Sequence, residues 1–392
     1  MTPAGAAIAL GAYAATLARR ALLRDRASLE AWQDRRLQAW LRDRVGVGRL
    51  SDLPEMDRVG LMTDFAAHNR LGLTVAAATA IAEDRAPLPA GYHVGLSTGT
   101  TSGRRMPYVI SDEERFVWLG TILAKSLGFN ALRRPRVAVA LPRGSALYDA
   151  ASQGRILPLC FVSLGDGFAA ALARLTAFRP DVIVAPPRLL HWLALQGAAL
   201  TPRHIFAAAE MLDPPDRAAI AAAFPGARLG EIYMATEGLF AVSCRHGRLH
   251  LAEDCLHFDL EAAGDGTAEA VITDFTRQAQ IMARYRTGDL LRVVPCNCGS
   301  PLRAVVVAGR AADRIGGYAP DTLRDALLGC GVADFRLVQR GDDDPTLTLA
   351  PGQATTGPRG VLEALFRRPV QVETHPLLLP EDAKLRRVMR TP

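Results

Sequence analysis

The sequence predicts an α/β protein with a large N-terminal domain of layered α/β substructures and a small α+β C-terminal domain. The chain has 392 residues, more than one compact hydrophobic core usually sustains. From about residue 94, short β-branched runs alternate with helical segments, as they do in layered folds. We expect the domain boundary at a hinge near Arg310, so that residues 1–308 form the larger domain and residues 309–392 the smaller.

The first 90 or so residues are predicted to be mostly helical. One amphipathic helix is expected to run from the apolar stretch 4–17 as far as Leu37. Arginines follow this stretch, whereas a signal peptide carries its positive charge before the apolar region, so a structural helix is favoured. The alternative is a helix on a membrane surface. Pro54 breaks the helical region and Pro87 ends it.

Short apolar runs rich in β-branched residues are predicted to be the strands of the large domain. They lie at 137–141, 182–185, 270–273 and 304–308, and a helix is expected at 189–196 after the second run. The tail is expected to contain helices at 321–328 and 360–366 and strands at 335–338, 346–349 and 370–373.

The composition excludes several classes of protein. Hydrophobic residues make up 49% of the chain and charged residues 22%, which is too apolar for a disordered protein. The net charge of +6 is small and scattered, so no nucleic-acid partner is expected. No segment is long and apolar enough for membrane insertion. Six unevenly spaced cysteines favour a reducing, cytoplasmic location over a disulfide framework.

Lysine is rare in this chain. It occurs only at Lys125 and Lys384, so the other 44 of the 46 basic residues are arginine. A retained lysine is therefore expected to mark a site that needs a compact ammonium group rather than a planar guanidinium. Lys384 stands eight residues before the end of the sequence, where the alternative is a solvated tail.

The most distinctive local feature is a run of glycines and small hydroxylated residues that ends in two arginines. Such a loop can wrap phosphates with backbone N–H groups and hydroxyls, because glycine allows close approach. It is not a Walker loop, since the spacing differs and the GK[ST] ending is absent; the alternative is a flexible turn. The run is Ser97-Thr98-Gly99-Thr100-Thr101-Ser102-Gly103-Arg104-Arg105.

Two further segments combine a carboxylate with turn residues. In the segment 232–238, an aromatic ring precedes Thr236 and Glu237, which could supply a hydroxyl and a carboxylate to phosphate and Mg²⁺. The alternative is an ordinary helix cap or turn. In the segment 284–290, Asp289 follows a Thr-Gly turn between strands and is placed to accept hydrogen bonds from ribose hydroxyls. The alternative there is a charged hairpin turn.

Taken in order, these segments resemble the motifs of the adenylate-forming superfamily of acyl-CoA synthetases, luciferases and adenylation domains. The chain is most similar to the short branch that contains phenylacetate–CoA ligases and deazaflavin-coenzyme synthetases. That branch has an S-[ST]-G-T-[ST]-G loop and the segments Y-x-x-T-E, R-Y-R-T-G-D, C-x-C-G and G-R-x-x-D. They correspond here to 97–103, 233–237, 284–289, 296–299 and 309–313, and the resemblance runs from about residue 50 to Lys384.

The resemblance implies that the N-terminal domain binds ATP and the acid. The loop 97–103 would hold the β- and γ-phosphates, and Asp289 would bind the ribose hydroxyls with Arg310 beside it. The ring of Tyr233 would stack on adenine. The adenine pocket would also contain Ala209 and Glu210.

The resemblance also implies three catalytic residues. Thr236 would contact the α-phosphate and Glu237 would ligate Mg²⁺. Lys384, on a mobile C-terminal domain, would bridge the carboxylate and the α-phosphate as negative charge develops. A carboxylate is a poor nucleophile, so catalysis would be mainly positioning and cationic stabilisation.

A narrower resemblance concerns the acid. Leu53-Pro54, Gly95-Leu96-Ser97 and the segment 114–120 resemble adenylate-forming enzymes of bacterial aryl-polyene (xanthomonadin-type) pigment and phenazine antibiotic clusters. That group implies activation of an aromatic acid such as 4-hydroxybenzoate in pigment biosynthesis or secondary metabolism.

Three departures from the family pattern concern the phosphate loop, the hinge and the thiol acceptor. Arg104 and Arg105 stand where many relatives carry lysine, and Ala312 stands where many carry an acidic residue. The segment 315–320 is shorter than the loop that lines the pantetheine tunnel of CoA ligases. We therefore expect an acyl carrier protein as acceptor, with an aryl-CoA ligase as the alternative. The alternative of another class is a nucleotide-binding protein with degenerate catalysis.

Cysteine and histidine spacing suggests a metal site. Cys244 and His250 precede Cys296 and Cys298, and three thiolates and one imidazole from two hairpins would suit a closed structural zinc site. The alternative is buried free thiols with an exposed His250. His246 and His257 are alternative ligands.

Overall fold

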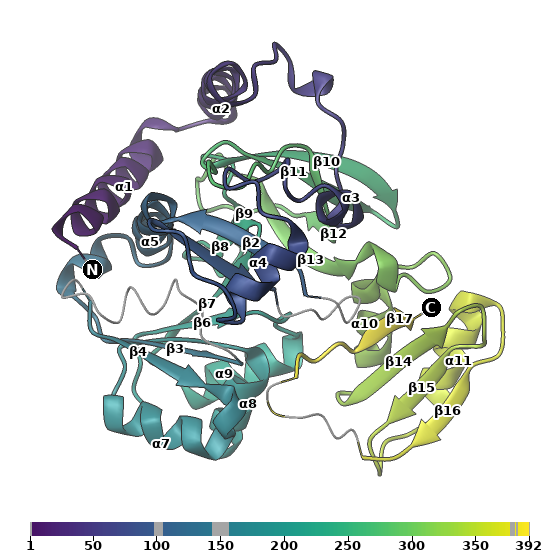
Figure 1. Ribbon diagram of the computed structural model, residues 1–392. Helices are drawn as coiled ribbons and strands as arrows, with labels where there is room; N and C mark the ends of the chain where they lie inside the picture. Colours follow the sequence, from purple (N-terminus) through teal and green to yellow (C-terminus); the bar gives the residue numbers. More distant parts are fainter. Residues whose placement is uncertain (1, 98–104, 143–156, 377–380, 382, 392) are drawn as a thin grey trace. The chain divides into compact units, whose positions relative to one another are not determined.

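The computed structural model describes residues 2–97, 105–142, 157–376, 381 and 383–391 (Figure 1). Their contacts divide the chain into two compact units. The first unit comprises Met1–Asp259, Val271–Arg286 and Pro295–Ala304, and the second comprises Leu260–Ala270, Thr287–Val294 and Val305–Pro392. The second unit therefore contains residues 309–392 together with three segments that precede them in the chain.

Helices and strands alternate through the first unit, which confirms the predicted α/β class. Its helices are α1 (Pro3–Leu22), α2 (Arg26–Trp40), α3 (Arg58–Thr63), α4 (Val75–Ala82), α5 (Asp112–Ser126), α7 (Phe168–Phe178), α8 (Pro187–Leu195) and α9 (Pro214–Ala223). Its strands are β1 (Tyr92–Leu96), β2 (Pro107–Ser111), β3 (Val137–Leu141), β4 (Leu159–Ser163), β5 (Val182–Ala185), β6 (His204–Ala208), β7 (Arg228–Ala235), β8 (Gly238–Ser243) and β9 (Leu249–Leu251).

Four strands contain residues of both units: β10 (Leu256–Gly264), β11 (Thr267–Asp274), β12 (Tyr285–Val293) and β13 (Ala304–Arg310). The rest of the second unit is formed by α10 (Pro320–Gly329), β14 (Phe335–Arg340), β15 (Thr346–Leu349), α11 (Thr356–Phe366), β16 (Gln371–Thr374) and β17 (Val388–Thr391). Short helical turns occur at Leu41–Val45, Leu50–Asp52, Gly128–Arg133, Leu164–Asp166 and Ala311–Asp313.

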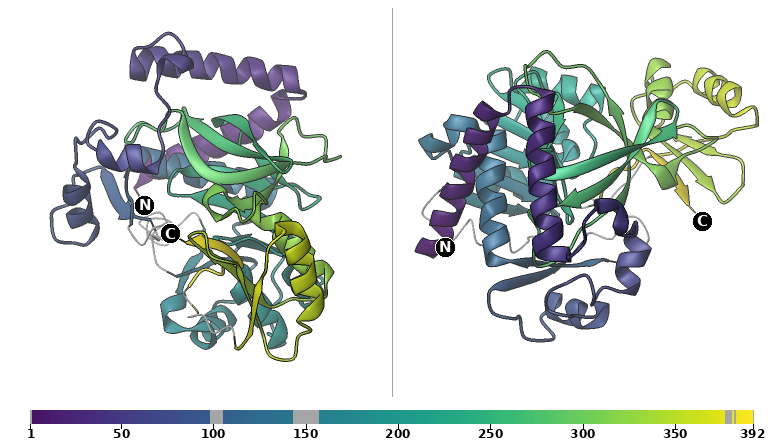
Figure 2. Two further views of the ribbon diagram at one scale, coloured as in Figure 1. Left: turned by 90° about the vertical axis from the view of Figure 1, so that its right-hand side faces the viewer. Right: turned by 90° about the horizontal axis from the view of Figure 1, so that it is seen from above.

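The N-terminal region forms two helices where the sequence predicted one. The break falls at Asp25, whose carboxylate accepts a hydrogen bond from the backbone N–H of Ser28 at 2.8 Å and caps α2. Helix α1 lies against α5 (Figure 2), and their closest approach is at Gly120, where a Cβ would collide with the carbonyl oxygen of Ala9. The apolar stretch at the start of the chain is thus a structural helix, as expected.

The central sheet of the first unit is buried on both faces. Within the first unit the strands are hydrogen-bonded in the order β9-β8-β7-β6-β5-β3-β4, and β3 to β7 run parallel. Alternate residues of β3 point to opposite faces, as the pleat of a strand requires. Ala138 and Ala140 join a core with α7, α8 and α9, and Val137 and Val139 join another that includes Leu127 after α5.

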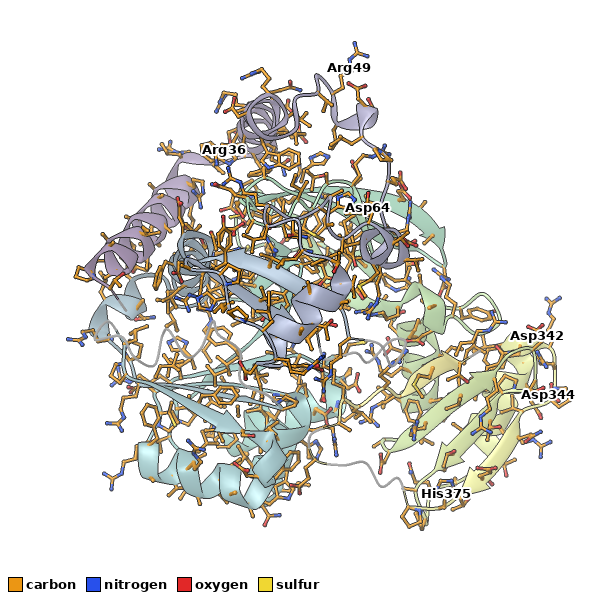
Figure 3. All side chains as sticks on the ribbon, viewed as in Figure 1. Arg36, Arg49, Asp64, Asp342, Asp344 and His375 are labelled. Atoms are coloured by element: carbon orange, nitrogen blue, oxygen red, sulfur yellow. The ribbon has the colours of Figure 1, made fainter. Side chains whose placement is uncertain are left out.

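The second unit has its own core and its own sheet. The strands follow the order β16-β15-β14-β17, and α10 and α11 contribute Leu323, Leu327 and Leu362 to the core. Figure 3 shows Asp342 and Asp344 projecting outward from the turn between β14 and β15, where they pair with Arg390 and Arg368.

The tail matches the prediction in its order of elements. Helices α10 and α11 and strands β14, β15 and β16 all fall where the pattern placed them. Strand β17 was not anticipated. It pairs in parallel with β14, through Leu337 opposite Val388. In the described part of the chain, no helix meets the length and hydropathy that a membrane crossing requires.

Candidate active site

The carboxyl ends of parallel strands gather several of the predicted nucleotide-binding residues. Ala208 at the end of β6 pairs with Ile232 of β7, so the next residues, Ala209 and Tyr233, are neighbours at this edge. Ala209 has a φ of 69°, where the chain leaves the strand before Glu210. Open α/β sheets bind their ligands at the carboxyl ends of the strands. The structure therefore brings together the three residues that the resemblance assigns to adenine.

Tyr233 is half-buried, and its ring contacts a ring of the adjacent strand. Its ring meets Phe240 of β8 edge-on, with 5.0 Å between centroids and 71° between planes. An edge-on contact is a favourable geometry for two aromatic rings. The contact supports the orientation of Tyr233 from the adjacent strand.

Thr236 and Glu237 form the tight turn between β7 and β8. The Thr236 hydroxyl donates to Glu237 Oε2 at 2.9 Å, and the Tyr285 hydroxyl donates to Glu237 Oε1 at 3.2 Å. Both donors are neutral. Among the described residues, no basic side chain forms an ion pair with the Glu237 carboxylate. The turn thus orients the Glu237 carboxylate through two neighbouring hydroxyl groups.

A buried arginine supports the backbone of this turn through hydrogen bonds. Arg277 is 1% exposed, and its Nη1 donates to the carbonyl oxygens of Thr236 at 3.3 Å and Glu237 at 3.4 Å. Its Nη2 donates to the carbonyl oxygen of Val109 at 2.9 Å, and its guanidinium lies 5.1 Å from the ring centroid of Trp118. Arg277 thus ties the turn to the strand β2 and the helix α5.

The charge of Arg277 is balanced by Glu114. Its Nε lies 3.8 Å from Glu114 Oε1, and the Glu114 carboxylate is 3% exposed. Glu114 also accepts a hydrogen bond from the Ser111 backbone N–H at 2.7 Å, as the third helical residue of a capping box does. The sequence motifs assign no role to Arg277 or Glu114. The S-x-x-E spacing at 111–114 was the one local signal for this part of the site.

A second buried carboxylate lies behind Gly238. Asp274 Oδ2 would lie 3.2 Å from a Cβ at this position, so a side chain there would crowd the carboxylate. Gly238 also has a φ of 158°, which L-residues rarely adopt. Asp274 is 1% exposed, and burial raises its pKa to about 6. Its Oδ1 accepts hydrogen bonds from the backbone N–H and the hydroxyl of Thr276, whereas its Oδ2 has no hydrogen-bond partner among the residues that the structure describes.

Asp289 and Arg310 lie opposite each other on β12 and β13 of the second unit. They are register partners in this antiparallel pair, and Arg310 Nε is 2.9 Å from Asp289 Oδ1. The predicted Thr-Gly turn before Asp289 is wrong, because residues 285–293 form one continuous strand. Gly288 has a φ of 74°, and the Asp289 N–H donates to the Thr287 hydroxyl at 3.1 Å. A local kink within the strand, rather than a hairpin turn, positions the Asp289 carboxylate.

Lys384 lies in a half-buried segment just before β17 of the second unit. Two residues beyond it, Arg386 Nη2 lies 2.5 Å from both oxygens of Asp313. Asp313 is 3% exposed and ends the helical turn that follows Arg310. The G-R-x-x-D motif thus anchors the segment that carries Lys384, which the linear sequence did not reveal.

The predicted phosphate loop is described only at its two ends. The Ser97 N–H donates to the Met106 carbonyl at 2.8 Å, and the Met106 N–H donates to the Ser97 hydroxyl at 2.8 Å, closing the β1–β2 hairpin. Residues 98–104 lie outside the described part of the chain. The roles of Thr98, Gly99, Thr100, Thr101, Ser102 and Gly103 therefore stay predictions.

The four predicted metal ligands converge in the first unit. The ligand atoms of Cys244, His250, Cys296 and Cys298 all lie within 4.8 Å of one another. His250 is 6% exposed, so the alternative of an exposed histidine is wrong, and burial lowers the pKa of its ring. The described cysteines are not joined by disulfides.

Comparison with known proteins identifies the architecture. No sequence family and no curated protein matches the chain. The solved structure of a 2-hydroxyisobutyryl-CoA ligase in the postadenylation state, in complex with R3-HIB-AMP, superposes with a TM-score of 0.67 and 16% identity over 95% of this chain and 91% of the ligase. The chain has the fold of adenylate-forming acyl-CoA ligases.

Two aryl-CoA ligases share the same fold. A benzoate–CoA ligase from Burkholderia xenovorans LB400 superposes with a TM-score of 0.55 and 16% identity, over 72% of this chain and 66% of that one. An anthranilate–CoA ligase in complex with anthranoyl-AMP gives a TM-score of 0.53 and 15% identity, over 73% and 64% of the two chains. The acyl-CoA ligase fold predicted from the motif order is thereby confirmed.

Proposed function

We propose that this protein is an ATP- and Mg²⁺-dependent enzyme that adenylates a carboxylic acid and transfers the acyl group to a thiol. The observation that carries the proposal is the Thr236–Glu237 turn at the carboxyl edge of a parallel sheet in an acyl-CoA ligase fold. Its carboxylate is held by two hydroxyl groups and a buried arginine supports its backbone. The domains proposed are 1–308 for ATP and acid and 309–392 for the catalytic lysine.

The chemistry has two steps. In the first, a carboxylate oxygen attacks the α-phosphorus of ATP, the bond between the α-phosphorus and the bridging oxygen breaks, and pyrophosphate leaves. In the second, a thiol loses its proton, its sulfur attacks the acyl carbonyl carbon, and AMP leaves. The first step concentrates negative charge at the α-phosphate oxygens, and the second places it on the acyl carbonyl oxygen and the departing AMP, so fixed cations and hydrogen-bond donors would supply most of the catalysis.

The residues of the site fit a magnesium ion and a nucleotide. Glu237 offers a hydroxyl-oriented carboxylate without an ion-pair partner among the described residues, and Mg²⁺ prefers such oxygen ligands. When bound, the ion would neutralise charge on the phosphates. Thr236 would donate to an α-phosphate oxygen, and Asp289 would accept from the ribose hydroxyls. Lys384 would place its ammonium between the carboxylate and the α-phosphate.

We propose an aromatic acid, with hydroxybenzoates first, as the substrate. The proposal rests on the resemblance to the phenylacetate–CoA ligase and deazaflavin-coenzyme synthetase branch and, within that branch, on the narrower resemblance to aryl-polyene and phenazine cluster enzymes. Two ligases of the same fold are named for the aromatic acids benzoate and anthranilate. Pigment or secondary-metabolite biosynthesis would follow from this substrate class.

We propose a carrier-protein pantetheine as the thiol acceptor, with free CoA as the second candidate. The short segment 315–320 after the hinge supports the carrier protein. The solved structures of this fold that are named as CoA ligases support the second candidate. Both acceptors present the same thiol, so the first half-reaction is common to them.

The decisive experiment is acid-dependent pyrophosphate release from ATP and Mg²⁺. The panel would contain 4-hydroxybenzoate, benzoate, anthranilate, 2-hydroxyisobutyrate, palmitate and a mixture of amino acids. We expect release with the aromatic acids, loss of release in Glu237→Gln, and near-normal release in the matched control Glu231→Gln, on the strand β7 that leads into the turn. Activity with palmitate or amino acids alone would remove the aromatic assignment, and no release with any acid would favour a nucleotide-binding protein without catalysis.

A further inference from the structure

The ligand atoms of Cys244, His250, Cys296 and Cys298 all lie within 4.8 Å of one another, and two of the distances between them have the lengths that a tetrahedral metal site requires. Cys244 Sγ and Cys296 Sγ are 3.7 Å apart, and Cys298 Sγ and His250 Nε2 are 3.4 Å apart. Zinc binds thiolate at about 2.3 Å and imidazole at about 2.0–2.1 Å, so tetrahedral angles put two sulfurs about 3.8 Å apart and sulfur and nitrogen about 3.6 Å apart. These two distances are close to the corresponding edges of a zinc tetrahedron.

The histidine is oriented by a second contact so that the correct nitrogen faces the sulfurs. His250 Nδ1 lies 2.7 Å from the carbonyl oxygen of Leu302, which can only accept a hydrogen bond. Nδ1 therefore carries the proton, and the lone pair of Nε2 points toward Cys298. A ring N–H donated to a backbone carbonyl is the usual support of a metal-bound histidine.

The backbone around the sulfurs is also arranged for thiolates. Cys244 begins a tight turn that ends at Gly247, whose φ is 74°, and the His246 N–H donates to Cys244 Sγ at 3.3 Å. Cys296 and Cys298 are each half-buried, whereas Asn297 between them is exposed. The alternation places both sulfurs on the side of the loop that faces the turn. N–H groups directed at sulfur stabilise the negative charge of a coordinating thiolate.

Two other interpretations of the cluster fit less well. A disulfide between Cys244 and Cys296 would need their sulfurs about 2.05 Å apart. It would also leave the close approach of Cys298 to His250 unexplained. Buried free thiols normally fill apolar cores, as Cys255 does at 7% exposure. Cys296 and Cys298 are instead half-buried between the exposed residues Pro295, Asn297 and Gly299, and Cys244 is half-buried at the start of the β8–β9 turn.

We infer that the first unit binds one zinc ion through Cys244, His250, Cys296 and Cys298 and that this ion is structural. Four protein ligands complete the tetrahedron and leave no open position for a substrate or water. The ion would join the β8–β9 turn to the loop between β12 and β13, two segments 52 residues apart. Cys244 directly follows β8, the strand that begins after Glu237, so the ion would secure the far end of that strand. The inference does not depend on the proposed adenylation.

The test is the metal content of the full-length protein purified without a histidine tag. We expect about one zinc per chain by elemental analysis, a drop below about a fifth of that in Cys296→Ser and His250→Gln, and full retention in two controls. The controls are His246→Gln, in the same turn but with an exposed side chain, and Cys160→Ser, far along the chain. Zinc that survives in Cys296→Ser and His250→Gln would overturn the assignment, as would wild-type protein without stoichiometric metal.

A second measurement uses the wild-type protein, so that the inference can still be tested if the variants fail to fold. Wild-type protein grown with cobalt should show the strong visible d–d absorption and near-ultraviolet thiolate charge transfer of tetrahedral cobalt with sulfur ligands. A chelator should release the ion, titrated with a zinc-binding dye, and lower the melting temperature. Weak octahedral cobalt absorption, or a Cys244–Cys296 disulfide in non-reducing peptide mapping of the freshly purified protein, would contradict a closed Cys₃His site.

Discussion

The chain contains only two lysines, and the structure gives them different surroundings. Lys125 lies in the last turn of α5 and forms an ion pair with Asp254, the two side chains being 11% and 6% exposed. Burial alone would raise the pKa of Asp254, but Lys125 and Arg19 hold it below its ordinary value. Lys384 lies in the half-buried segment before β17. We predict that Lys125 serves the fold and Lys384 serves the first chemical step.

Lys125→Ala should therefore lower the melting temperature, and Lys384→Ala should lower the reaction rate. Removing one partner of a buried pair costs about 3–5 kcal/mol. Arg19 Nε stays 3.5 Å from Asp254 Oδ2, so we expect the lower end for Lys125→Ala, about 3 kcal/mol. At about 2–4 °C per kcal/mol, the melting temperature should fall by roughly 6–12 °C. Lys384→Ala should lower it by less than about 2 °C, because we assign the Lys384 ammonium to the reaction and not to the fold.

The rates should show the reverse pattern. Loss of one charge-stabilising group at a reacting centre costs about 10²–10³ in rate, or about 2.7–4 kcal/mol of barrier. Lys384→Ala should lose that much acid-dependent pyrophosphate release while its ATP affinity stays near normal. Lys384→Arg should also be poor, because a guanidinium does not replace a compact ammonium between two oxyanions. Lys125→Ala, assayed well below its melting temperature, should keep most of its rate.

The thiol half-reaction separates catalysis from folding. The family resemblance implies that Lys384 is turned away for this step, so acyl transfer from preformed acyl-adenylate should survive in Lys384→Ala. The reasoning would be refuted if Lys384→Ala kept more than about a tenth of wild-type adenylation. Equal loss of both half-reactions with a large fall in melting temperature would instead assign Lys384 to the fold.

Two further predictions concern the buried groups behind Glu237. Arg277→Met removes the donor to three carbonyl oxygens and leaves Glu114 buried without its cation. The free energy of unfolding, measured by denaturant titration, should therefore fall by about 3–5 kcal/mol. Unchanged stability would show that the arginine is dispensable. Burial raises the pKa of Asp274 from its ordinary value of 3.8 to about 6 in the folded protein. Between these two pH values, the folded protein keeps a proton on Asp274 that the unfolded chain has released. Its contribution to stability is therefore lost as pH rises from about 4 to about 6. Melting curves from pH 4.5 to 7.5 should show Asp274→Asn gaining on the wild type as pH rises, and parallel curves would contradict the raised pKa.

The local sequence was sufficient for the fold class and for several elements. Strands at 137–141 and 346–349 were predicted to the residue, because their β-branched runs and bounding turn residues are local signals. The break between α1 and α2 was missed, although Asp25 and Ser28 form a capping box there. The apolar periodicity continues across this break, and the capping residues were the stronger signal.

The sequence by itself also determined which residues to consider for chemistry. Motif order indicated Thr236, Glu237, Asp289 and Arg310, and cysteine spacing indicated the four metal ligands. In the structure, Asp289 and Arg310 form an ion pair, and the four predicted metal ligands lie close together. Residues that are distant in the sequence become neighbours there because the strands that carry or flank them pair in a sheet.

Only the tertiary structure decided what supports those residues. Arg277 reaches Val109, Thr236 and Glu237, which lie up to 168 positions away in the sequence, and no local pattern records these contacts. Strand β17 was equally hidden, since its pairing with β14 depends on residues far from it in the chain. A buried polar group is stable only when its partners come from several elements at once, so such partners become identifiable when the elements are assembled.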